Sequence, residues 1–154
     1  MLYVEGRLPY EETLSLLALD APEIRPIKDP TPEQLEQLES IINTAEGIFS
    51  PWPEDFNGRA AIGCFLYSQE EQPEDGTLRD ALAACVGLEI PLFAVIGMST
   101  ELLAMPSDGL HTLICLHEFC HLLEPLHNDD FELLFGRQLL AFFAIQSRDE
   151  STQK

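Results

Sequence analysis

The sequence predicts a small α+β domain, and three observations point to this class. The chain has 154 residues, which suits one domain with a single hydrophobic core. Its composition, with 45% hydrophobic and 23% charged residues, is that of an ordinary globular protein. Short apolar runs typical of strands alternate with segments whose apolar residues recur at helical spacing. We therefore expect residues 1–147 to form one domain and residues 148–154 to form a flexible tail.

The first part of the chain is expected to contain a short strand, Leu2–Val4, and a helix over Tyr10–Leu19. A second helix begins at Thr31, which suits the N-cap, with Pro32 at the first helical position. Apolar residues then recur at helical spacing, so one face of this helix is predicted to pack on the core. They are Leu35, Leu38, Ile41, Ile42 and Ala45.

The middle of the chain carries two short apolar runs beside glycine or proline, Ala60–Tyr67 and Pro91–Met98. We predict both to be buried strands. Gly63 and Gly97, within these runs, mark bulges or close packing. Between the strands, residues 70–75 are predicted as an acidic loop and residues 77–86 as a helix.

The last third is predicted to form two helices. The first is capped by Ser107 or Asp108, runs toward Leu123 and is ended by Pro125. The second begins at Asp129.

Asp129 and Glu132 have the spacing of a capping box, and both acids complement the positive end of the helix dipole. The apolar stripe of this helix ends near Gln146.

The chain is strongly acidic. It has 27 Asp and Glu residues against 8 Lys and Arg residues, a formal net charge of −19. Such a surface repels phosphate backbones, so nucleic-acid binding is disfavoured. No apolar run approaches the roughly 18 residues of a spanning helix, and the N-terminus does not resemble a signal peptide. We expect a cytoplasmic protein without a membrane segment, whose four cysteines, none in C-x-x-C spacing, are buried thiols.

The chemistry is expected in residues 117–121, HEFCH, on the first of the two C-terminal helices. His117 and His121 are four residues apart, so both imidazoles share one helix face and can reach one metal ion. Glu118 lies beside the first ligand and can act as a general base. Buried histidines without a metal would need hydrogen-bond partners for every ring nitrogen, and this favours metal binding.

His127 is one candidate for the third ligand, because the chain can turn back after Pro125 and bring its imidazole to the metal. Glu124 is the rival, since it shares the helix face of the two ligand histidines. His111 lies six residues before His117, on a different face of the helix, and we expect it to cap or support the site rather than to ligate.

Residues 112–121, TLICLHEFCH, resemble the active-site helix of zincin-type metallopeptidases, most closely that of the SprT-like and YgjP/WLM-like branches. Residues 127–131, HNDDF, resemble the segment of those branches in which the third zinc-binding histidine precedes the next helix. The resemblance implies ligation of one Zn²⁺ by His117, His121 and His127, with Glu118 as general base. It also implies a zincin-like fold, in which a short mixed sheet packs against this helix and an edge strand aligns a peptide.

The sequence therefore predicts a zinc metallopeptidase that hydrolyses peptide bonds with metal-bound water activated by Glu118, and whose partner is a peptide or protein substrate. Two alternatives remain open at this point. One is a non-catalytic zinc-binding or regulatory module derived from a zincin, and the other is a metal-dependent hydrolase of a non-peptide substrate.

Overall fold

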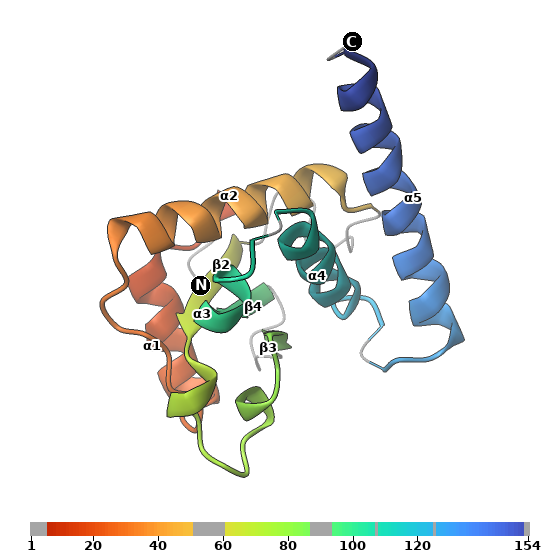
Figure 1. Ribbon diagram of the computed structural model, residues 1–154. Coiled ribbons are helices and arrows are strands. Elements are labelled where there is room, and N and C mark those ends of the chain that lie inside the picture. The colour runs from red at the N-terminus through yellow and green to blue at the C-terminus, as the bar shows by residue number, and fades with distance from the viewer. Residues whose placement is uncertain (1–5, 51–60, 87–93, 107, 125, 153–154) are drawn as a thin grey trace.

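The computed structural model describes residues 6–50, 61–86, 94–106, 108–124 and 126–152, and it has the predicted α+β class (Figure 1). Some of the predicted features lie outside the described residues. They are the strand Leu2–Val4, the residue Ala60, residues 91–93 at the start of the strand predicted over Pro91–Met98, and the residues Ser107 and Pro125. The elements, in chain order, are β1 (Gly6–Arg7), α1 (Tyr10–Asp20), α2 (Pro32–Ile48), β2 (Ala61–Tyr67), η2 (Gln69–Glu71), η3 (Thr77–Arg79), β3 (Ala83–Val86), β4 (Ala94–Ser99), α3 (Thr100–Leu103), α4 (Asp108–Cys120) and α5 (Asp129–Thr152).

The described strands form one mixed four-stranded sheet in the order β1-β2-β4-β3. β1 and β4 are both parallel to β2, and β3 is antiparallel to β4. Ala83 of β3 lies opposite Met98 and Val86 lies opposite Val95. Within the described part of the chain, β3 is therefore an edge strand.

Both faces of the sheet are covered. Successive side chains of a strand point to opposite faces, so one strand contributes to two separate cores. Cys64 and Leu66 of β2 join the larger core, which α2, α4 and α5 complete. Phe65 and Tyr67 join a smaller core with Leu17 of α1. The sheet thus lies between α1 and the other long helices.

The glycines of both central strands mark close packing, as predicted. A β-carbon at Gly63 would lie 2.7 Å from Thr13 Oγ1 of α1, and one at Gly97 would overlap the ring of Phe65. Either substitution would force the neighbouring side chain to move.

The start of α2 confirms the predicted cap. The Thr31 hydroxyl accepts a hydrogen bond from the Gln34 N–H at 3.1 Å, and the Gln34 side chain accepts one from the Thr31 N–H at 2.9 Å. Pro32 occupies the first turn, and the predicted apolar face of α2 is buried at Leu38, Ile41, Ile42 and Ala45.

The predicted helix over residues 77–86 is wrong. Residues Thr77–Arg79 form only a 3₁₀ turn, and Ala83–Val86 form the strand β3. Alanine and leucine in this segment favour a helix locally, but the segment pairs with β4, and the Ser99 N–H donates to the Leu82 carbonyl at 2.9 Å. Tertiary pairing therefore outweighs helix propensity here.

The last helix starts at the predicted residue but has a different N-cap and a later end. It starts at Asp129, so the N-cap is Asn128, whose side-chain oxygen accepts a hydrogen bond from the Phe131 N–H at 3.0 Å. The predicted capping box of Asp129 and Glu132 is therefore wrong, because the N3 residue is Phe131, whose side chain cannot accept a hydrogen bond to close a box. The helix continues to Thr152, beyond the predicted end near Gln146.

None of the four cysteines is in a disulfide; Cys64, Cys115 and Cys120 are buried and Cys85 is partly buried. No helix among the described residues is both long and apolar enough to cross a membrane.

Candidate metal centre

The end of α4 presents two histidines on one face. α4 ends at Cys120, and the chain continues as a tight turn in which the His121 N–H donates to the Glu118 carbonyl at 3.1 Å. The Glu124 N–H donates to the Cys120 carbonyl at 2.9 Å. These bonds keep helical winding through His121, so its ring lies beside that of His117, with ring centroids 5.1 Å apart.

The loop between α4 and α5 brings the third histidine to the same point. His127 Nε2 lies 3.2 Å from His117 Nε2 and 3.0 Å from His121 Nε2. The ligand atoms of all three residues lie within 4.8 Å of one another. Nitrogen ligands at tetrahedral angles around zinc are about 3.3 Å apart, given Zn–N bonds of 2.0–2.1 Å. The His127 nitrogen has this spacing to both of the others, so the three histidines form a group that could hold a metal ion.

The protonation of the rings also fits a metal ligand set. His121 Nδ1 lies 3.0 Å from the Glu124 carbonyl oxygen, and a proton on Nδ1 makes this hydrogen bond and leaves the Nε2 lone pair free. Burial lowers the pKa of His117 to about 4, and the neighbouring His121 and His127 rings contribute smaller shifts in the same direction, so this ring is neutral at pH 7. Converging lone pairs on neutral rings repel one another unless a cation or a shared proton lies between them.

One aromatic side chain contacts all three imidazoles. Phe131, in the first turn of α5 and 4% exposed, has its ring centroid 4.8 Å from that of His117, 4.7 Å from that of His121 and 4.9 Å from that of His127. It stacks on His121 with an interplanar angle of 26°. Phe135, one turn later, also contacts His117, and the centroids of the two rings are 5.3 Å apart.

Glu118 lies between the histidines and the sheet edge. Its side chain is buried, Oε2 is 4.0 Å from His117 Nε2, and the carboxylate accepts a backbone hydrogen bond from Cys85 of β3. Burial raises the pKa of Glu118 to about 7, partly offset by the hydrogen bond from Cys85. Burial and the Glu118 charge raise the pKa of the Cys85 thiol to about 12, so this thiol stays protonated and unreactive at pH 7.

An apolar cavity adjoins the site. It has a volume of about 500 Å³ and extends from His117 and Glu118 between α4, α5 and the start of β3. Its apolar lining consists of Ala81, Leu82, Ala83, Leu110, Leu113, Ile114 and Phe135, and Asp80 lies at its exposed rim.

The remaining predicted candidates lie outside the ligand group. Glu124 does not belong to the group of side chains that could share a metal ion, and it contributes its backbone carbonyl to His121 instead. His111 is 1% exposed, and its Nε2 lies 2.8 Å from the Leu102 carbonyl oxygen, which joins α4 to α3. His111 is thus a structural residue one and a half turns from the site.

Sequence reasoning missed the part of the site that β3 supplies. Cys85 and the β3 side of the cavity fall in the segment predicted as a helix. The run that ends in Val86 is apolar and is followed by Gly87. The other two strands were predicted from the same pattern, so this signal could have identified β3 as a strand.

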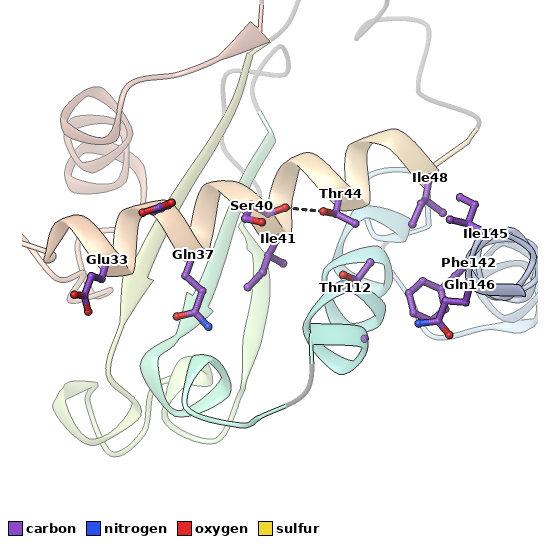
Figure 2. A pocket seen from close by; sticks show the side chains of 12 residues that line it. Glu33, Gln37, Ser40, Ile41, Thr44, Ile48, Thr112, Phe142, Ile145 and Gln146 are labelled. Atoms are coloured by element: carbon purple, nitrogen blue, oxygen red, sulfur yellow. Dashed lines mark hydrogen bonds between the residues drawn. The ribbon is translucent and has the colours of Figure 1, made fainter. Parts of the chain in front are cut away.

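A second hollow lies at the other end of α4 (Figure 2). This groove of about 540 Å³ is bordered by α2, by Gly109 and Thr112 of α4, and by Phe142 and Gln146 of α5. In Figure 2 a hydrogen bond from the Thr44 hydroxyl to the Ser40 carbonyl, 2.8 Å long, lies on its α2 wall. None of the ligand histidines borders it, so it is separate from the candidate metal centre.

Comparisons with protein-family models, with curated proteins and with solved structures give no match.

Proposed function

We propose that this protein is a zinc-dependent metallopeptidase with its active site at the end of α4. The observation that carries the proposal is the convergence of three imidazole Nε2 atoms beside a buried carboxylate at a sheet edge. His117, His121 and His127 would hold the ion. Zinc is the metal we expect, because it prefers tetrahedral nitrogen ligands and a three-histidine set leaves one position open. When bound, zinc acidifies water and polarises a carbonyl group.

Glu118 is the proposed general base. Burial raises the pKa of this carboxylate to about 7 in the metal-free protein, which moves it toward the range suited to proton transfer near neutral pH. Its Oε2 atom is close to His117 Nε2 without belonging to the ligand group, so it can take a proton from the attacking water and return it to the leaving amine. The hydrogen bond from the Cys85 backbone fixes the carboxylate in this position.

The edge of β3 is the proposed peptide-binding surface. The Cys85 N–H points away from β4 toward Glu118, and backbone groups of alternate residues in an antiparallel pair point to the same side. The N–H and C=O of Ala83 therefore face the same outer edge as Cys85. An extended peptide can pair with such an edge, as in strand addition.

The adjoining cavity suggests which side chain the peptide presents. Its lining by Leu110, Leu113, Ile114 and Phe135 suits a large apolar residue next to the scissile bond. Asp80 at the rim and the net charge of −19 favour a basic residue nearby. We therefore expect cleavage beside a large apolar residue in a basic context.

The test compares the zinc-loaded wild type with Glu118→Gln on a mixed peptide library, with cleavage products identified by mass spectrometry. We expect cleavage by the wild type and a loss of about 10²–10⁴-fold in Glu118→Gln at unchanged zinc content. Glu101→Gln, a matched acid-to-amide change on α3 outside the ligand group, should cleave like the wild type. Equal products from wild type and Glu118→Gln, or none from either, would contradict the proposal and favour a non-catalytic zinc module.

A further inference from the structure

α5 is apolar on two opposite faces. Its inner face is buried against α4 and α2 through Phe131, Leu134 and Phe142. In Figure 1 α5 runs along one side of the molecule, with α2 and α4 on its inner side. A helix packed on one side only is expected to be polar on the other.

The outer face of α5 instead carries large exposed apolar side chains. Leu133 is 70% exposed, Leu140 is 74% exposed and Phe143 is 53% exposed. A β-carbon at Gly136, between them, would meet no atom within 4 Å, so the backbone is open to close approach there. These positions lie on the side of the helix opposite the buried residues.

The spacing of the outer residues is that of a coiled-coil seam. Leu133, Gly136, Leu140 and Phe143 are separated by three, four and three residues, which is the alternation of a and d positions in a heptad. This seam is continuous over three helical turns. It faces away from the body of the molecule, so a second helix can lie along it without meeting α2 or α4.

The charges beside the seam select its partner. With Leu133 at position a, Glu132 occupies position g and Arg137 occupies position e, and both side chains are exposed. In a parallel pair of helices, the g residue of one chain faces the e residue five places later in the other. Two identical α5 helices would therefore form the pair Glu132–Arg137 twice, on the two sides of one seam.

We propose that α5 pairs with α5 of a second copy of this chain in a parallel, two-fold symmetric dimer. The three exposed side chains offer on the order of 100 Å² each, which makes the apolar seam smaller than a standard interface of about 1,600 Å². The dimer is therefore expected to dissociate on dilution. The inference does not depend on the proposed peptidase activity.

Sedimentation velocity of the full chain, at physiological salt and across the micromolar range, tests the dimer. We expect a species of twice the 17.3 kDa chain mass that grows with concentration. Leu140→Glu should weaken the dimer about tenfold or more. Leu19→Glu, at a 79% exposed leucine of α1, is the matched control and should leave it unchanged. Circular dichroism establishes that each variant is folded, since neither leucine is buried.

A charge exchange tests the parallel arrangement. Arg137→Glu should weaken the dimer, and the double variant Glu132→Arg with Arg137→Glu should restore it, because both pairs re-form with reversed signs. A monomer at every concentration would overturn the proposal. An unchanged dimer dissociation constant in Leu140→Glu would also overturn it. So would a double variant whose dimer is no stronger than that of Arg137→Glu.

Discussion

Phe131→Leu should weaken zinc binding more than it weakens the fold. The Phe131 ring contacts all three ligand imidazoles at centroid distances of 4.7 to 4.9 Å. Leucine fills most of the same space, so the change should cost less than about 1.5 kcal/mol of unfolding free energy. It removes the flat surface that orients the rings, however, and groups that orient metal ligands typically contribute 10–100-fold in affinity. We therefore expect the zinc dissociation constant to rise about 10–100-fold, or about 1.4–2.7 kcal/mol.

Phe142→Leu is the matched control. Phe142 lies on the same helix and is 6% exposed, but its ring lies beside Gly109 at the far end of α4 rather than beside the histidines. Both variants should lose similar stability in urea unfolding of the metal-free protein, while only Phe131→Leu should lose zinc to a competing chromophoric chelator. Equal zinc affinity in the two variants would refute a positioning role for Phe131.

Three further predictions concern the cap, the base and the cavity. Asn128→Ala should lower the unfolding free energy by about 1 kcal/mol through loss of the α5 cap and should also weaken zinc binding, because the cap adjoins His127. Thr31→Ala should cost similar stability at the α2 cap without changing zinc affinity in the same titration. At pH 7 the metal-free Glu118 side chain is half protonated, since its pKa is about 7, and a nearby cation favours its ionised form. Zinc binding should therefore release up to about half a proton more from the wild type than from Glu118→Gln, and the zinc affinity of the wild type should rise more steeply with pH. Calorimetry in buffers of different ionisation enthalpy measures the number of protons released. Equal proton release from the two proteins would contradict the prediction. Leu110→Trp should narrow the cavity, and we compare kcat/KM for two peptides that have either a large apolar residue or alanine beside the scissile bond. The ratio of the first kcat/KM to the second should fall by about tenfold in the variant. An unchanged ratio would exclude the cavity as the specificity site.

Local signals in the sequence predicted the four longer helices, α1, α2, α4 and α5, and the histidine group that could hold a metal ion. The cap at Thr31 depends on neighbouring residues only, and so does the placement of His117 and His121 on one helix face. The preference for His127 over Glu124 rested on a family resemblance, and the described structure groups His127, not Glu124, with the other two histidines.

Long-range contacts decided what the sequence could not predict. Residues 83–86 pair with β4, although their alanines favour a helix. The contact of Phe131 with all three imidazoles depends on the packing of α5 against α4, which no single segment encodes.

The metal content of the purified protein, measured by mass spectrometry beside His127→Ala and Glu124→Gln, tests the central claim most directly. We expect one zinc ion per chain in the wild type and in Glu124→Gln, and loss of the ion in His127→Ala. A wild type that stays free of zinc after zinc is supplied would contradict a metal centre at the end of α4. Zinc retained in His127→Ala but lost in Glu124→Gln would contradict the three-histidine ligand set.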